Sequence, residues 1–314
     1  MSGMPTKRGL TADVVRSHAE GLTLEVPGSI ANLGPGFDAL AVAVQLYLRV
    51  TVSRVDASAP GRITVTPALG GDDYIVRSIA TLAAREGVEL PGLGLEVRSD
   101  IPMQAGLGSS GAAIVAGLLL YDRLTGEAGR DLLAEATAFE GHPDNVAAAL
   151  LGGLTAACVG SQDRVVGLSS PWPDAVRFVA ATPDVRVKTA DARRVLPSEF
   201  SRADAVFNLQ RVALLLQAIR TGRTDVLAEA LADRWHQPYR APLVPGLSEA
   251  LALKHPNLLG VCLSGSGPTV AALCIGDTTG VEDALTGIYS RLGLACRVRT
   301  LAAHNGPPRF IERS

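Results

Sequence analysis

The stretch Pro102-Met103-Gln104-Ala105-Gly106-Leu107-Gly108-Ser109-Ser110-Gly111-Ala112 joins a strand pattern to a long, mostly apolar helix pattern. Residues 94–100 alternate apolar and polar side chains, and residues 112–124 contain no proline. The glycines leave backbone N–H groups accessible to an anion, and Ser109 and Ser110 add hydroxyl donors. The positive end of the following helix points at the same loop. The stretch therefore predicts a phosphate-binding loop.

Two other nucleotide-binding patterns fit this loop poorly. A Walker A sequence places Lys-Ser or Lys-Thr after its last glycine, but no lysine occurs between Arg98 and Arg123. Gly106, Gly108 and Gly111 have only an approximate dinucleotide-binding context, because the acidic residue about 20 positions later would follow a helix instead of ending a second strand. On the residues alone, a tight turn that packs helix on strand remains the structural alternative.

Three further motifs accompany the loop in order. They read Val26-Pro27-Gly28-Ser29-Ile30-Ala31-Asn32-Leu33-Gly34-Pro35-Gly36-Phe37-Asp38, then Glu140-Gly141-His142-Pro143-Asp144-Asn145-Val146-Ala147-Ala148 followed by Gly152-Gly153, and Leu263-Ser264-Gly265-Ser266-Gly267-Pro268-Thr269. With the loop pattern Pro-x-x-x-Gly-Leu-Gly-Ser-Ser, they resemble the GHMP small-molecule kinases. The first two resemble the homoserine kinase branch in particular. The resemblance extends from about Leu24 to about Cys274.

The resemblance implies an α+β fold with the two-domain GHMP kinase architecture. We expect an N-terminal, ATP-binding, ribosomal-protein-S5-like domain over residues 21–165 and a C-terminal ferredoxin-like α/β sandwich over residues 166–314. Residues 1–20 are polar and lack a convincing period, so we expect a loosely ordered extension. The residues agree with this class, because strand and helix patterns mix without the regular βαβ order of a doubly wound sheet.

Composition excludes several classes of partner. The chain has 314 residues, enough for two domains, and 47% of them are hydrophobic. A formal net charge of -2 gives no electrostatic case for nucleic acid or an anionic membrane. The 4 cysteines show no C-x-x-C spacing, so no zinc site is expected. Without a signal core or an apolar run of roughly 20 residues, a cytoplasmic protein is expected.

The resemblance also implies ATP and Mg²⁺ as cofactors. The loop residues Pro102 to Ala112 would bind ATP. Glu140 and Ser110 would hold the metal, since Mg²⁺ takes one or two carboxylates together with phosphate oxygens. Glu135, one helical turn earlier, is a second carboxylate candidate, and a helix cap or a solvated side chain is the structural alternative for Glu140.

A second cluster is assigned to the acceptor by the same resemblance. Asn145 would contact the acceptor hydroxyl, and His142 and Asp144 would lie on the substrate side. Alone, Asp-Asn before a helix is more often an N-cap. Whether any side chain acts as a general base stays open. The expected catalytic residues are Asn145, Glu140, Arg240 and Asp144.

An amino-acid acceptor needs partners for both of its charges. Arg193 and Arg240 fit the carboxylate, because a guanidinium meets it bidentately, with Thr189 assisting. Asp38 and Asn32 would meet the ammonium from the opposite side of the pocket. The expected substrate is L-homoserine.

Two alternatives remain for the function. Another GHMP kinase would phosphorylate mevalonate or shikimate, and a silent relative would sense a sugar or a nucleotide without catalysis. The intact loop and Glu140 disfavour a silent relative. A homodimer is the expected assembly if the chain is not a monomer.

Overall fold

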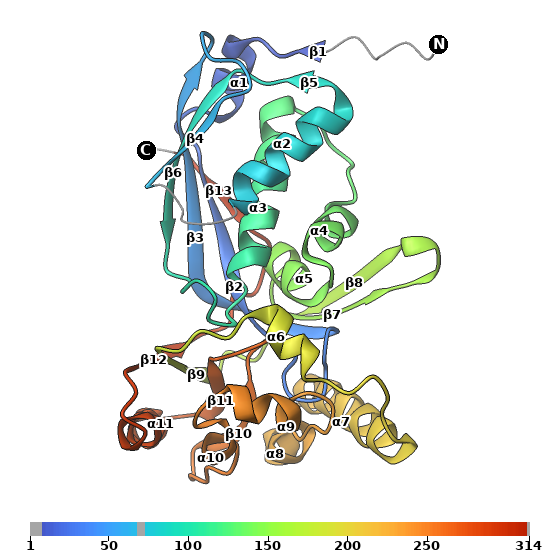
Figure 1. The fold of residues 1–314 in the computed structure, drawn as a ribbon, viewed down its shortest axis with the longest axis vertical. Helices are drawn as coiled ribbons and strands as arrows, with labels where there is room; N and C mark the ends of the chain where they lie inside the picture. Colours follow the sequence, from blue (N-terminus) through green and yellow to red (C-terminus); the bar gives the residue numbers. More distant parts are fainter. Residues whose placement is uncertain (1–7, 68–72, 313–314) are drawn as a thin grey trace.

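A seven-stranded sheet carries the first half of the chain, in a computed structural model that describes residues 8–67 and 73–312 (Figure 1). Its strand order is β13 (Arg309–Ile311), β2 (Thr23–Ala31), β3 (Leu40–Asp56), β6 (Gly92–Ser99) and β4 (Ile63–Thr66). β3 also pairs with β7 (Leu154–Val159), which pairs with β8 (Val165–Ser170). Only the β4–β6 pair is parallel within the described sheet. Along β3, Leu46, Leu48 and Val50 are buried, as their alternation with polar residues predicts.

Four helices cover one face of this sheet (Figure 1). They are α2 (Tyr74–Glu86), α3 (Ser109–Thr125), α4 (Leu132–Glu140) and α5 (Asp144–Leu151). α3 is apolar on nearly all sides, with Ile114, Leu118 and Tyr121 fully or almost fully buried. It therefore runs through the core, and its N-terminal end emerges at the junction with the second domain.

The second domain contains a four-stranded antiparallel sheet. Its order is β10 (Leu258–Leu263), β11 (Val270–Ile275), β9 (Val176–Pro183) and β12 (Cys296–Leu301). The helices are α6 (Thr189–Arg194), α7 (Arg202–Thr221), α8 (Leu227–Ala230), α9 (Gln237–Arg240), α10 (Leu247–Leu251) and α11 (Thr279–Arg291), with short 3₁₀ turns η2 (Thr224–Val226) and η3 (Ala241–Leu243). A third 3₁₀ turn, η1 (Ser161–Asp163), joins β7 to β8 in the first domain. The α+β, two-domain prediction is confirmed. Within the described ranges, no helix is long and apolar enough to cross a bilayer.

The domain boundary does not lie between residues 165 and 166, where we expected it. That boundary falls at the start of β8, inside the hairpin with β7, and β13 returns from the second domain to pair with β2. The described chain thus crosses between the domains twice, after β8 and after β12. These two connecting segments touch, because the Trp172 N–H donates to Asn305 Oδ1 (2.8 Å) and Asn305 Nδ2 donates to Trp172 O (3.0 Å).

The expected loose extension also differs where the structure describes it, from residue 8 onward. β1 (Arg8–Gly9) pairs with β5 (Val88–Glu89), and α1 (Ala12–Ala19) follows. Thr11 caps α1, and Val15 and Ala19 are buried against the first domain. Two buried apolar residues in a short polar helix give too weak a period to recognise in the sequence. Residues 1–7 lie outside the described residues.

Candidate active site

A cavity of about 440 Å³ lies between the two domains. This volume falls within the range typical of small-molecule sites. Its lining contains most of the residues predicted from the sequence: Asn32, Asp38, Met103, Gln104, Gly106, Gly108, Ser109, Ser110, Glu140, His142, Asp144, Asn145, Thr189, Arg193 and Arg240. The structure thus brings the glycine loop and the charged cluster into one space.

Part of the glycine loop faces away from this cavity. The lining does not include Pro102, Ala105, Leu107, Gly111 or Ala112. Some of these anchor the loop instead, because the Leu107 carbonyl accepts from the Ser29 N–H (3.0 Å) and the Ala105 carbonyl accepts from the Thr269 N–H (3.2 Å). Ser264 Oγ, in the motif Leu263–Thr269, also donates to Gly106 O (2.6 Å), so this motif supports the loop.

The N-terminal end of α3 opens into the cavity at Gly108. This residue has φ = 73°, in the left-handed region, and no described side chain caps the helix there. A Cβ at position 108 would lie 2.2 Å from Ser29 Oγ and 3.2 Å from Asn145 Oδ1. Glycine is therefore required by the backbone angle and by the space. The uncapped N–H groups and the helix dipole suit an anion.

Glu140 and Ser110 form a pair on the cavity wall. Ser110 Oγ donates to Glu140 Oε1 at 2.6 Å, and burial raises the pKa of Glu140. A partly buried carboxylate beside a hydroxyl is a donor set that suits a hard divalent cation. Glu135, the other candidate ligand, does not line the cavity, and its carboxylate accepts two hydrogen bonds from Arg85 (2.6 and 2.9 Å).

Asp144 organises the acceptor side of the site. Its Oδ1 lies 2.6 Å from His142 Nδ1 and accepts from the Asn145 N–H (2.7 Å) and from Asn145 Nδ2 (3.2 Å). Ser29 Oγ donates to Asn145 Oδ1 (2.8 Å), so the Asn145 amide is held on both sides. Burial disfavours the charged ring of His142, but the hydrogen bond and charge of Asp144 outweigh it and raise the pKa of His142.

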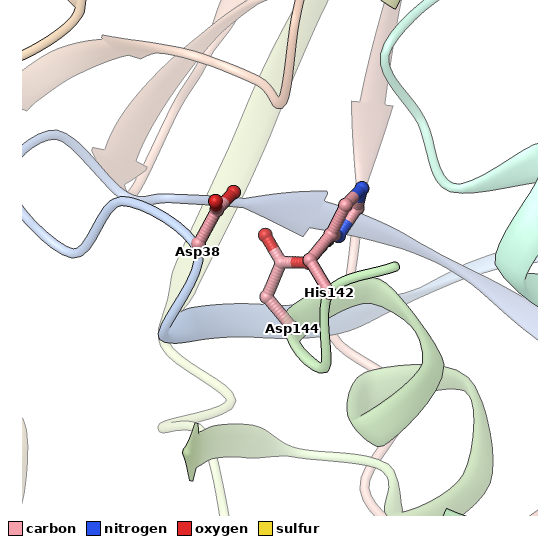
Figure 2. Close-up of side chains that lie close together, drawn as sticks. All are labelled: Asp38, His142 and Asp144. Carbon is pink, nitrogen blue, oxygen red and sulfur yellow. Dashed lines mark hydrogen bonds and ion pairs between the residues drawn. The ribbon is translucent and has the colours of Figure 1, made fainter. Parts of the chain in front are cut away.

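Asp38 points toward this pair (Figure 2). One ligand atom from each of Asp38, His142 and Asp144 lies within 4.8 Å of the others. Both Asp38 oxygens also accept from Arg193, from Nη1 and from Nη2, each at 2.9 Å. The expectation that Asp38 and Arg193 face each other across the pocket is therefore wrong. The fold brings these two residues, which are 155 positions apart in the sequence, into direct contact.

Arg240 is the more buried of the two arginines, with 2% of its surface exposed. Its Nε donates to Ala192 O and its Nη1 donates to Gly265 O, both at 3.0 Å. Burial and the nearby Arg193 charge lower the pKa of Arg240 to about 10. Asn32 links Asp38 to the Gly265 carbonyl that also accepts from Arg240. Its Nδ2 donates to Gly265 O (3.1 Å), and its Oδ1 accepts from the Asp38 N–H (3.1 Å).

Comparison with known proteins agrees with this arrangement. The family profiles described as "GHMP kinases N terminal domain" and "GHMP kinases C terminal" match residues 73–153 and 215–287. The chain is 43% identical to the homoserine kinase of Solibacter usitatus over 79% of its own length and 83% of that protein. It is 38% identical to the homoserine kinase of a Nostoc species over 90% and 96% of the two lengths.

The chain belongs to the homoserine kinases of the GHMP family. A crystal structure of the homoserine kinase from Cytophaga hutchinsonii is similar to it with a TM-score of 0.80 and 28% identity, covering 93% of this chain and 98% of that one. The similarity spans both domains. The four motifs recognised in the sequence therefore lie in a fold that this family shares.

Further residues line the cavity of this homoserine kinase family member without having been assigned to it from the sequence: Phe37, Leu48, Tyr74, Ile75, Ser99, Ile101, Ala113, Val187, Lys188, Gly265 and Ser266. Phe37 lies within the N-terminal motif, so a signal for it was present. Its ring lies 5.5 Å from Arg193 Cζ and 5.1 Å from Arg240 Cζ. The other apolar lining residues come from unrelated strands and helices, and only the tertiary fold collects them.

Proposed function

We propose that this chain transfers the γ-phosphoryl group of ATP to the side-chain hydroxyl of L-homoserine. The bond between the γ-phosphorus and the oxygen that bridges to the β-phosphate breaks. A bond forms between the γ-phosphorus and the hydroxyl oxygen, and the hydroxyl proton is released. The products are ADP and O-phospho-L-homoserine. The observation that carries this proposal is one cavity that joins an anion-binding loop to a cluster of charges matched to a zwitterion.

The nucleotide would bind on the α3 side of the cavity. The uncapped N–H groups at Gly108 and Ser109 and the dipole of α3 favour its phosphates. Ser110 and Glu140 would hold Mg²⁺, because together they offer a hydroxyl and a partly buried carboxylate 2.6 Å apart. When bound, the ion neutralises charge on the phosphates during transfer.

The acceptor would bind on the opposite side, at the cluster of charged residues. Arg193 and Arg240 would meet its carboxylate, with Thr189 beside them, and Asp38 and Asn32 would meet its ammonium. Because Asp38 and Arg193 pair with each other, a zwitterion can insert its two charges between them and keep both neutralised. A monoanion would leave Asp38 without a partner. The site therefore favours an amino acid over a simple hydroxy acid.

Asn145 would align the acceptor hydroxyl for transfer. Its amide is fixed by Ser29 and Asp144, which makes it a rigid donor or acceptor next to Gly108. Asp144 then acts as a positioning residue, since one of its oxygens already takes three hydrogen bonds. Catalysis would depend on alignment and electrostatic stabilisation. The product would serve threonine biosynthesis in the cytoplasm, and a homodimer remains a prediction.

A coupled ADP-release assay tests this function. The purified protein is incubated with ATP and Mg²⁺ and with homoserine, mevalonate, shikimate or galactose in turn, and a reaction without acceptor measures background ATP hydrolysis. We expect kcat/KM for homoserine to exceed that for each of the others by at least about two orders of magnitude, as two charged contacts allow. Turnover of mevalonate or shikimate at the homoserine level would refute the assignment.

A further inference from the structure

The buried ring of His236 contacts the arginine that lies deepest in the cavity. His236 has none of its surface exposed, and it precedes α9, which carries Arg240 one helical turn later. Its Nδ1 lies 3.3 Å from Arg240 Nη1, and its Nε2 lies 2.7 Å from Gly34 O. The ring also stacks on Phe37, with the centroids 5.4 Å apart. His236 thus joins the N-terminal motif to Arg240.

The neighbours of His236 decide which ring nitrogen carries the proton. A carbonyl oxygen only accepts, so the short contact with Gly34 O requires a proton on Nε2. The Asp233 carboxylate, 3.6 Å from Nε2, favours the same tautomer. Burial lowers the pKa of His236 and keeps the ring neutral. Nδ1 then presents a lone pair, which accepts a hydrogen bond from Arg240.

Hydrogen bonds also hold the backbone around His236. The Asp233 carboxylate accepts from the N–H groups of Trp235 (2.8 Å), His236 (3.0 Å) and Gln237 (2.7 Å). Gly34 has φ = 75°, and a Cβ there would lie 2.1 Å from Leu231 O, so only glycine allows this close approach of the two domains. Hydrogen bonds therefore hold both the backbone and the ring of His236 in place.

The contact with His236 occupies one N–H donor of the Arg240 guanidinium. Arg240 has five N–H donors. Nε donates to Ala192 O, and Nη1 donates to Gly265 O and to His236 Nδ1. The two N–H groups of Nη2 have no acceptor among the described residues, and Arg240 lines the cavity.

We propose that His236 is a positioning residue that fixes the rotation of the Arg240 guanidinium, so that Nη2 is presented to the carboxylate of the acceptor. This inference rests on the proposed function, because it assumes that Arg240 contacts the acceptor. On this proposal, the function of His236 depends on the lone pair on Nδ1. Without that acceptor, Nη1 has a buried donor unsatisfied, and the guanidinium can turn away from the cavity.

Two substitutions of similar size separate the two ring nitrogens. In His236→Asn the amide oxygen can replace Nδ1 as acceptor for Arg240, whereas in His236→Gln the amide can replace only Nε2 as donor to Gly34 O. Both lose the stacking on Phe37. We expect KM for homoserine to rise about tenfold more in His236→Gln than in His236→Asn, as for one hydrogen bond to a charged group. KM for ATP should change less than twofold in both.

The same pair is measured in an Arg240→Ala background. We expect the difference between the asparagine and glutamine variants to disappear there, because their common target is absent. Equal homoserine KM values in the two single variants, or a difference that persists without Arg240, would overturn the proposal. A purely structural role would lower the melting temperature of both variants without separating the two KM values.

Nitrogen-15 NMR of the unaltered protein gives a test that needs no variant and no turnover. The buried Nε2 proton should exchange slowly with solvent and identify the ring of His236. We expect Nδ1 to show the shift of an unprotonated nitrogen, and a proton on Nδ1 would refute the inference. Absence of homoserine turnover by the wild type would instead refute the proposed function, so the two failures are distinguishable.

Discussion

Replacing Asp38 with asparagine removes the charge that we assign to the acceptor ammonium. Asp38 has φ = 54°, a left-handed conformation that asparagine tolerates well, so Asp38→Asn adds no backbone strain. The backbone N–H at this position can still donate to Asn32 Oδ1. The variant therefore changes the charge and little else.

The magnitude follows from the contacts of Asp38. Its side chain is 32% exposed and that of Arg193 is 39% exposed, so solvent screens the pair and reduces its contribution to about 1 kcal/mol. The ammonium of homoserine loses a charged hydrogen bond of about 1.5–2 kcal/mol, which lowers kcat/KM about 10- to 30-fold. For 4-hydroxybutyrate, which lacks the amino group, Arg193 is released and kcat/KM rises about fivefold. The preference for homoserine should fall by roughly two orders of magnitude.

The assay compares kcat/KM for the two acceptors by ADP release. Asp191→Asn is the matched control, because Asp191 pairs with Arg194 at 2.9 Å on the surface of α6 and does not line the cavity. We expect the ratio of the two kcat/KM values to stay within twofold in this control. If the ratio is unchanged in Asp38→Asn, or falls equally in Asp191→Asn, the assignment of the ammonium to Asp38 is wrong.

Three further predictions concern the rest of the site. Gly108→Ala and Gly222→Ala both place a side chain at φ near +70°, which costs about 1–2 kcal/mol of stability. Gly222→Ala should show only this loss and should retain ATP binding, since nothing lies within 4 Å of its Cβ. Gly108→Ala should lose more, because its Cβ would lie 2.2 Å from Ser29 Oγ, and it should abolish ATP binding in calorimetry. Glu140→Gln should raise the Mg²⁺ concentration needed for activity. It should also stabilise the metal-free protein at neutral pH. Because the pKa of Glu140 is raised in the folded protein, its carboxyl group stabilises the fold only when protonated, and this stabilisation is lost as the pH rises through the folded pKa. An unchanged Mg²⁺ titration would contradict the first expectation, and an unchanged melting temperature would contradict the second. Arg193→Ala should lower kcat/KM for homoserine at least about tenfold while KM for ATP stays within twofold, and Arg194→Ala on the same helix should change neither value.

Local features of the fold were predictable from the sequence. The glycine loop was recognisable because a strand pattern, a glycine-serine turn and an apolar helix follow one another within about thirty residues, and each has a short-range physical cause. β3 was predictable from the alternation of Leu46, Leu48 and Val50 with polar residues. The motif residues could be assigned to one cavity only through the family resemblance.

Contacts between distant segments could not be predicted. The pairing of Asp38 with Arg193 depends on how α6 lies over the first domain, and no sequence period records it. β13 is short and exposed, so its pairing with β2 leaves no hydrophobic pattern. Two of the Arg240 donors bond to the carbonyls of Ala192 and Gly265, which any residue type at those positions would supply.

The contact between Trp172 and Asn305 has a consequence for motion. Two independent connecting segments would let the domains both rotate and slide. Here two hydrogen bonds between Trp172 and Asn305 join the two segments. The tied segments therefore restrict sliding of the domains at this end. Direct contacts restrict it at the cavity as well, because the Thr269 N–H donates to Ala105 O (3.2 Å) and Ser264 Oγ donates to Gly106 O (2.6 Å). We expect only small relative motions of the domains, because a large rotation would have to break these hydrogen bonds too.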